Sequence, residues 1–388
     1  MTIHLRPEIE GLKDKIISTR RDIHQNPELA FDEHRTSKLV AERLESFGIE
    51  VQTGVGKTGV VGSLKGNVGK TIALRADMDA LPIQETSDIS YKSINDGIMH
   101  ACGHDGHTAM LLGVAEALSK QTKKLNGTVK FFFQPAEEGQ GGARFMIEDG
   151  ALTGVDEVYG IHLWNYQKYG TIGVKPGPIM AAADIFEITI NGKGGHGAAP
   201  QGTKDAVLIA AHLIQTLQTI VSRNTNPIES TVVTVGEING GYNFNIIADT
   251  VNLKGTTRAY TEENRQLIKD RMVEIIAGTE KTFDAKIELD YEDGYPSTVN
   301  DPSAAEKLLL AAREIVGDGA GHPYLSMGGE DFSYFLQKVP GCYFLVGSAP
   351  EDHEPLSVPH HCSHFDIDER ALLVGSSVYL QLVDDILS

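Results

Sequence analysis

The sequence is poor in cysteine and has no long hydrophobic run. Its three cysteines, Cys102, Cys342 and Cys362, are an odd number at no disulfide-like spacing, which in a chain of this length predicts a reducing compartment. The N-terminus has no apolar signal-peptide region, and no run of about 18 apolar residues is available to span a bilayer. We therefore expect a cytoplasmic protein in which any special cysteine has a chemical role.

Positive charge is also scarce, because 34 lysines and arginines face 53 aspartates and glutamates, giving a formal net charge of -19 at pH 7. An acidic surface repels both nucleic acid and an anionic membrane face, which excludes them as main partners. A small molecule is the expected partner. The length of 388 residues exceeds that of one ordinary domain, so two domains are expected.

The hydrophobic pattern divides the chain into two domains. Short apolar runs alternate with helical periodicity over residues 1–183 and again over 297–388, which predicts one discontinuous α/β domain with a mixed sheet covered by helices. Between them, residues 184–296 follow a β-α-β-β-α-β order, typical of a ferredoxin-like domain, here inserted as a lid. Helices are expected at residues 8–24, 32–47, 106–119, 142–149, 204–222, 261–282, 302–316, 330–337 and 367–386.

One thiol and three imidazoles lie within the nine residues Met99–His107, just ahead of an expected helix. Cysteine and histidine are natural ligands of zinc and similar divalent ions, and Gly103 and Gly106 allow the backbone to bend so that Cys102 and His104 converge. The alternative is an ordinary helix N-terminus with solvent-facing histidines. The segment is thus a candidate metal site.

Adjacent carboxylates, Glu137 and Glu138, follow the apolar strand expected at 129–133. The carboxyl ends of strands form the ligand crevice of an open α/β sheet, so this is a suitable place for a working site. One carboxylate can bind a metal while its neighbour acts as general base toward water. A solvated acidic turn is the alternative.

Two further strand ends carry polar side chains, with Asp77 and Asp79 after the strand at 71–74 and His162 at the end of 155–161. Asp79 is placed to hold a ligating imidazole in orientation. A lone histidine at a strand end is more often a hydrogen-bonded core residue, but several polar strand ends in one sheet favour a common site. The histidine-rich segment 359–365 supplies one distant ligand, and composition leaves open which histidine it is.

Two glycine-rich loops need separate interpretations. Gly194–Pro200 places His196 in a loop that permits close backbone approach to a ligand, although a simple turn is the alternative. Gly54–Thr58 ends in Gly-Lys-Thr, but a phosphate-binding loop requires a glycine where this chain has Val51. We interpret the second loop as a turn before a strand.

Seven segments together resemble the aminoacylase, hippurate hydrolase and auxin-conjugate amidohydrolase group of dinuclear metallopeptidases. They run in the order of that group across nearly the whole chain, and the inserted domain expected from periodicity agrees with the fold of that group. The segments are Arg75–Pro82, Met99–His107, Gln134–Gly139, Gly160–Trp164, Gly194–Pro200, Gly328–Phe332 and His361–Phe365.

The resemblance implies a ligand set and catalytic roles. It implies two divalent ions, of zinc, manganese, cobalt or nickel, held by Cys102, His104, Glu138, His162 and His361, with Cys102 as the bridging ligand. Glu137 matches the general base, and Asp79 matches the carboxylate that supports the site from behind. His361 is chosen over His360 because the histidine of the group lies four residues before the phenylalanine matched by Phe365.

The inserted domain matches further substrate-binding residues. His196 matches a histidine that steadies the substrate or its oxyanion, from the same subunit or from a partner in a homodimer formed through the lid. Arg258 is a candidate for binding a substrate carboxylate, which a guanidinium does bidentately. Asn245 is carried over from a segment that in the group often reads Asn-Val-Ile-Pro-Asp, whereas this chain has Asn245-Ile246-Ile247-Ala248-Asp249.

The expected function is the metal-dependent hydrolysis of the amide bond of an N-acyl-amino acid, with an N-acetyl, N-benzoyl or similar group, to a carboxylate and a free amino acid. Alternatives of the same fold are a dipeptidase or carboxypeptidase and a deacetylase of N-acetyl-diaminopimelate. An alternative of another class is a non-catalytic metal-binding protein. The presence of Glu137 beside Glu138 favours an enzyme.

Overall fold

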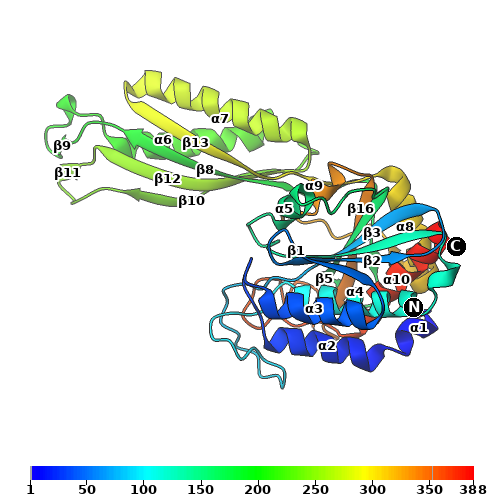
Figure 1. Cartoon of the computed structure of the whole chain (residues 1–388). Helices are drawn as coiled ribbons and strands as arrows, with labels where there is room; N and C mark the ends of the chain where they lie inside the picture. The colour runs from blue at the N-terminus through cyan, green and yellow to red at the C-terminus, as the bar shows by residue number, and fades with distance from the viewer. Residues whose placement is uncertain (1, 352) are drawn as a thin grey trace. The chain divides into compact units, whose positions relative to one another are not determined.

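The chain forms two compact units (Figure 1), and the computed structural model describes residues 2–351 and 353–388. Unit 1 comprises Met1–Ile179, Val299–Leu325 and Asp331–Ser388, and unit 2 comprises Met180–Thr298 and Ser326–Glu330. The domain boundaries expected from sequence, after residues 183 and 296, lie within a few residues of these. The sequence pattern predicts residues 326–330 in the larger domain, whereas in the structure they group with unit 2.

Unit 1 is built on a mixed sheet with the strand order β1-β2-β4-β3-β5-β16-β6-β15. β3 pairs in parallel with β4 and β5, and its register places Asp77 opposite Gln134. The carboxyl ends of these central strands therefore meet at one edge of the sheet, where an α/β fold places its ligands. The strands are β1 (Glu50–Val55), β2 (Gly59–Lys65), β3 (Lys70–Asp77), β4 (Gly127–Gln134), β5 (Glu157–Lys168), β6 (Ile172–Gly173), β15 (Ala320–Gly321) and β16 (Gly341–Ala349).

Helix α4 (His104–Ser119) is the central helix of unit 1. Every residue from His104 to Leu118 is buried, and the helix packs against α2, α10 and β3. Its first residue, His104, thereby lies beside the carboxyl end of the sheet. The other helices of this unit are α1 (Pro7–Glu10), α2 (Lys13–Gln25), α3 (His34–Ser46), α5 (Gly142–Glu148), α8 (Pro302–Val316), α9 (Ser333–Leu336) and α10 (Arg370–Leu387), with short turns at Thr122–Lys124 and Gly317–Gly319.

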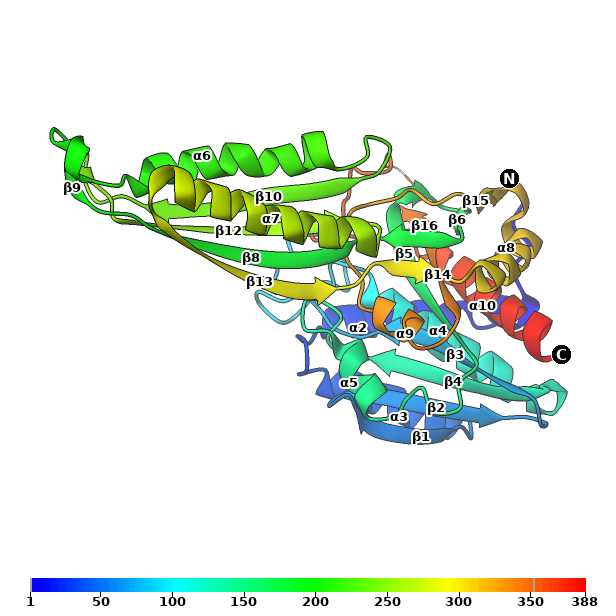
Figure 2. The same cartoon turned by 90° about the horizontal axis from the view of Figure 1, so that it is seen from above.

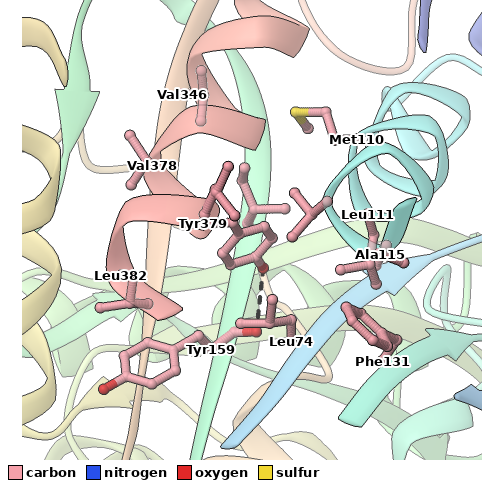
Figure 3. Packing of buried hydrophobic residues seen from close by; sticks show 14 of the residues in the cluster. Leu74, Met110, Leu111, Ala115, Phe131, Tyr159, Val346, Val378, Tyr379 and Leu382 are labelled. Carbon is pink, nitrogen blue, oxygen red and sulfur yellow. Dashed lines mark hydrogen bonds between the residues drawn. The ribbon is translucent and has the colours of Figure 1, made fainter. Parts of the chain in front are cut away.

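The core of unit 1 joins α4, α10 and the central strands (Figure 3). Leu74 of β3 and Met110 of α4 are fully buried in this cluster. The hydroxyl of Tyr379 donates to the carbonyl oxygens of Arg75, at 3.0 Å, and Tyr159, at 3.2 Å. Because a buried hydroxyl is costly without a partner, these bonds let the buried Tyr379 side chain of α10 contact β3 and β5.

Unit 2 has the predicted β-α-β-β-α-β order, and its sheet order β10-β12-β8-β13 is antiparallel throughout, as in a ferredoxin-like fold. Both helices cover one face of this sheet (Figure 2). Phe186, Ile188 and Ile190 of β8 alternate toward that face and are buried there. The elements are β8 (Ala182–Asn191), β9 (Gly195–His196), α6 (Ala206–Thr219), β10 (Thr231–Gly240), β11 (Ile246–Ile247), β12 (Thr250–Ala259), α7 (Glu262–Phe283) and β13 (Lys286–Tyr295), with short helical turns at Pro200–Gly202 and Ile220–Asn224. The strand pair β7 (Gly177–Met180) and β14 (Thr298–Asn300) belongs mostly to unit 1.

The start of each unit 2 helix is set by a capping side chain. Asp205 accepts from the backbone N–H groups of Val207 and Leu208, and Thr261 accepts from that of Asn264. These caps satisfy N–H groups that have no partner inside the helix. They explain why the predicted helix positions in this unit are close to the observed ones.

Three local predictions differ from the structure. The helix expected at 8–24 is two helices, Pro7–Glu10 and Lys13–Gln25. The helix expected at 330–337 is limited to Ser333–Leu336, and strand β1 was not expected because its residues are mostly exposed and polar. The Gly-Lys-Thr segment forms the expected turn, between β1 and β2, with Lys57 in the left-handed region at φ 77°.

One described helical stretch, Ala206–Asn224, has the length and a mean hydropathy of 1.2 that a membrane span requires, in contrast to the expectation that no segment is apolar enough to span a bilayer. Its apolar character has a local explanation in unit 2. Ile209, Leu213 and Leu217 are buried against the four-stranded sheet. The core helix of a soluble domain passes the same test of length and composition.

Candidate metal centre

The five expected ligands come from four segments of unit 1 that meet at the carboxyl edge of the sheet. Gly103 takes a φ of 93°, a conformation that favours glycine, and so turns the chain from the cysteine into helix α4. The glutamates follow β4 after Ala136, which is itself in the left-handed region at φ 55°. The ligands are Cys102 and His104 around the start of α4, Glu138 after β4, His162 on β5 and His361 between β16 and α10.

Two groups of three ligand atoms share Cys102. Its Sγ lies with the imidazole nitrogens of His104 and His162 in one group, and with Glu138 and His361 in the other, and within each group all atoms are within 4.8 Å of one another. The Sγ of Cys102 is 3.5 Å from Nε2 of His162, and Nε2 of His361 is 3.2 Å from Oε1 of Glu138. This arrangement suits a thiolate that bridges two ions.

Asp79 holds the surrounding groups in place. Its two carboxylate oxygens accept the backbone N–H groups of Glu137, at 3.0 Å, and Glu138, at 2.9 Å. Its carbonyl oxygen accepts Nδ1–H of His104 at 2.9 Å. One buried aspartate therefore fixes both the glutamate loop and the histidine ring, and the ring presents Nε2 to the centre.

His162 and His107 are both buried but have different roles. His162 donates from Nδ1 to the carbonyl oxygen of Leu163 at 2.6 Å, so its Nε2 is directed to the thiol. His107 donates from Nδ1 to Asp77 at 2.5 Å and accepts the backbone N–H of Leu163 at Nε2, 2.8 Å away. Both nitrogens of His107 are thus used in bracing β3 against β5.

Burial and charge perturb the titration of these groups. Burial, Glu138 and Glu137 raise the pKa of the Cys102 thiol well above its usual range. Burial opposes protonation of His104, but Asp77 and Asp79 raise its pKa to about 10. Burial and the neighbouring His107 and His360 lower the pKa of His162 well below its usual range. A bound divalent cation would reverse the first two shifts, because ligation requires a thiolate and a neutral imidazole.

The donor set fits divalent metal ions. Among the residues that the structure describes, Nε2 of His104 is buried and has no hydrogen-bond partner, as expected of an atom reserved for another ligand. A thiol, three imidazoles and a carboxylate are the ligands preferred by zinc and similar ions. The chemistry of the residues thus agrees with the expected two-metal centre.

Glu137, the expected general base, lies against this centre. Its carboxylate is within 4.8 Å of ligand atoms of His104 and Glu138, and the residue is 6% exposed. Oε1 accepts the backbone N–H of Asp331 at 3.4 Å. The group is thereby close enough to exchange a proton with water at the centre.

The substrate-binding residues expected in the inserted domain lie in unit 2. His196 is exposed on β9 and pairs in register with Ile246 of β11, while the carbonyl oxygen of Asn245 accepts the N–H of Gly197 at 2.8 Å. These contacts bring His196 and Asn245 together. Arg258 lies near the other end of β12, where burial lowers its pKa although Asp184 opposes the shift.

Sequence reasoning gave no role to two buried carboxylates beside the glutamate loop. Glu33 accepts the N–H of Ala136 at 2.9 Å and the hydroxyl of Thr58 at 2.5 Å. Asp331 accepts from Arg75 at 3.0 Å and from the N–H of Ala143 at 3.0 Å. Asp331 lies in a segment that carries the resemblance, but Glu33 has no local signal because its partners are distant in sequence.

The parallel strand ends, the shared thiol and the adjacent glutamate define a class, that of metal-dependent hydrolases. The sequence also matches Peptidase family M20/M25/M40 over residues 73–385, and the chain belongs to this family. The expected recognition and fold class are thereby confirmed.

The chain is similar to known proteins over nearly its whole length. The sequence is 41% identical over 387 residues to the hippurate hydrolase of Campylobacter jejuni, with 98% of each chain covered. It is 44% identical over 383 residues to thermostable carboxypeptidase 2 of Saccharolobus solfataricus, with 97% of each covered. The crystal structure of the YXEP protein of Bacillus subtilis, described as a dinuclear metal-binding peptidase of the M20 family, is similar with a TM-score of 0.86 at 36% identity, covering 97% of this chain and 99% of that chain.

Proposed function

We propose that the protein hydrolyses the amide bond of an N-acyl-amino acid and releases a carboxylate and a free amino acid. The observation that carries this proposal is the sharing of Cys102 between two ligand groups beside Glu137. The similarity to a hippurate hydrolase and, at 42% identity over 372 residues, to an N-acetyl-L-cysteine deacetylase of Bacillus subtilis supports a small acylated amino acid as substrate.

In this proposal, one ion is held by Cys102, His104 and His162 and the other by Cys102, Glu138 and His361. Divalent ions bound there supply Lewis acidity toward the substrate carbonyl and lower the pKa of water. Zinc, manganese, cobalt and nickel all suit these donors. Asp79 keeps the glutamate loop and the ring of His104 in place throughout.

Glu137 is the general base and then the general acid of the proposed mechanism. Its carboxylate takes a proton from the attacking water and later delivers it to the nitrogen of the leaving amine. Three residues of unit 2 complete the proposal: His196 stabilises the developing oxyanion, and Asn245 and Arg258 bind the substrate.

We also propose a cytoplasmic homodimer formed through unit 2. Cys102, Cys342 and Cys362 are free, which agrees with a reducing compartment. Strand β10 is an edge of the unit 2 sheet and carries Ile238, which is 55% exposed, and the following loop carries Phe244, which is 96% exposed. An Ile238→Asp variant that elutes as the wild type does by size exclusion with light scattering would contradict a dimer through this edge.

A carboxypeptidase or dipeptidase is the second candidate, favoured by the similarity to thermostable carboxypeptidase 2. A deacetylase of N-acetyl-diaminopimelate and a non-catalytic metal-binding protein are the remaining alternatives. The test is amino-acid release from N-acetyl-, N-benzoyl- and dipeptide substrates and from N-acetyl-diaminopimelate, by protein loaded in turn with each of the four metals. Faster release from acyl-amino acids than from dipeptides is expected. No hydrolysis with any metal, by protein that binds two ions, would refute an enzymatic function.

A further inference from the structure

Unit 1 contains a second cluster of buried ionisable side chains, which the proposed mechanism does not use. Arg20 and His24 of α2, together with Asp105, are fully buried, and Glu85 is 2% exposed. The burial of several ionisable groups is costly unless each is paired and hydrogen-bonded. The contacts of Arg20 indicate what this cluster does.

The guanidinium of Arg20 joins two segments that carry expected metal ligands. Its Nε donates to Asp105 at 2.8 Å, and Asp105 directly follows His104 in the first turn of α4. Its Nη2 donates to Asp366 at 2.9 Å, and its Nη1 donates to Glu369 at 3.3 Å, both shortly after His361 in the chain. One rigid planar group therefore links the first turn of α4 to the segment that follows His361.

Neighbouring side chains fix the two partners of Arg20. Nδ1 of His24 donates to the same oxygen of Asp105, at 2.8 Å, so the carboxylate is held from two directions. The hydroxyl of Tyr91 donates to Asp366 at 3.0 Å. The centroid of the Tyr91 ring lies 4.9 Å from the guanidinium carbon of Arg20. Hydrogen-bonded carboxylates and the ring of Tyr91 thus fix the orientation of the Arg20 guanidinium group.

The two ligand groups depend on Arg20 to different degrees. His104 is already fixed by Asp79, and His162 is part of strand β5. The segment that carries His361 lies outside the helices and strands, and the side chain of His361 is 52% exposed. It is anchored by the N–H of His361 to the carbonyl oxygen of Ala101, at 2.8 Å, and further along by Arg20. Loss of Arg20 should therefore disturb the second group more than the first.

We propose that Arg20 is a positioning residue that fixes the His361 segment against the start of α4, and so sets the affinity for the ion held by Cys102, Glu138 and His361. This inference rests on the ligand assignment of the proposed function. Arg20 acts through the ligands and has no role in proton transfer.

The test is a calorimetric titration of metal-free protein with Mn²⁺ and, separately, Co²⁺. Wild type is expected to bind two ions in two steps. Arg20→Met should weaken one step about 10- to 100-fold, the usual effect of losing a group that orients a metal ligand, and leave the other step within about threefold. Arg20→Lys, which keeps a charge, should restore part of the loss.

Two further variants make the test specific. Asp366→Asn removes the charge of a partner of Arg20 whose side chain is 28% exposed, and should weaken the same step even if Arg20→Met fails to fold. Arg21→Met is the matched control, because Arg21 is the next residue of α2 and pairs with Glu369 at 2.6 Å while its side chain is 45% exposed. The Arg21 variant should bind both ions as wild type does.

Three results would overturn the inference. They are wild-type affinities in both Arg20→Met and Asp366→Asn, an equal weakening of both steps together with a lower melting temperature of the metal-free protein, and a loss in Arg21→Met as large as in Arg20→Met. Each of these leaves the proposed function standing. A wild-type protein that binds fewer than two ions would instead refute the ligand assignment, and this inference with it.

Discussion

The two units hold their candidate functional residues in opposite ways. In unit 1 the proposed base and most of the proposed ligands are buried around strand ends and the start of α4, and Asp79 fixes two of their segments through three hydrogen bonds. In unit 2, His196 is exposed on a two-residue strand whose partner is equally short. The first arrangement favours fixed geometry for charged ligands. The second leaves the side chain of His196 exposed.

Replacement of Glu137, the proposed base in unit 1, should have the largest effect on turnover. Glu137→Ala should lower kcat about 10²- to 10⁴-fold, because a positioned general base contributes on that scale. Metal content, measured by mass spectrometry, should stay at the wild-type value, since Glu137 is not an assigned ligand. Glu138→Gln is the contrasting variant and should lose metal. Near wild-type kcat in Glu137→Ala on every accepted substrate would show that another group is the base.

Removal of the exposed histidine should lower turnover with no structural consequence. His196→Ala should reduce kcat about 10²- to 10³-fold if the ring stabilises an oxyanion. Its melting temperature and metal content should match wild type, because the ring is exposed. His212→Ala, which removes another exposed histidine of unit 2, is the control. Equal kcat in the two variants would place His196 outside the chemistry.

Loss of one carboxylate oxygen of Asp79 should weaken metal binding and leave the fold in place. Asp79→Asn retains the size of the side chain but replaces one acceptor oxygen by an amide, so one of the N–H groups of Glu137 and Glu138 loses its partner. Metal affinity should fall about 10- to 100-fold. Competition with a chromophoric chelator measures this change. Unchanged affinity would mean that the glutamate loop is held adequately by other contacts, such as that of Glu33.

The last expected effect is on the pH dependence of stability, and it comes from Glu33. Burial raises the pKa of Glu33 from 4.5 to about 7, so the folded protein binds the proton more tightly than the unfolded chain does. Its contribution to stability is therefore complete below pH 4.5 and is lost as pH rises toward about 7. The loss should amount to about 3 kcal/mol, at roughly 1.4 kcal/mol per pKa unit.

Urea unfolding of wild type and Glu33→Gln between pH 4.5 and 8 measures this contribution. The difference in the free energy of unfolding between the two proteins should change with pH in the direction given. A difference that is constant over this range would show that Glu33 titrates normally. Glu33 lies in unit 1, so this result also tests how strongly burial shifts the pKa of a carboxyl group beside the candidate metal centre.

Much of the architecture could be predicted from local patterns. The alternation of Phe186, Ile188 and Ile190 with polar residues gave the first strand of unit 2, and the order of elements that follows gave its ferredoxin-like fold. These patterns persist because burial on one face of a strand or helix acts over a few residues. Strand β1 has no such apolar pattern, which is why it was not found.

The sequence by itself determined the ligand types and the class of chemistry. Cys102 and His104 lie just ahead of a helix and Glu137 and Glu138 follow a strand, and these short segments indicate a candidate metal centre. Only the tertiary structure decided how these groups are supported. Asp79 contacts both glutamates, Asp331 contacts Arg75, and Arg20 contacts Asp105 and Asp366 across separations of tens to hundreds of residues. These contacts depend on how whole helices and strands pack together, and a local sequence pattern carries no information about that packing.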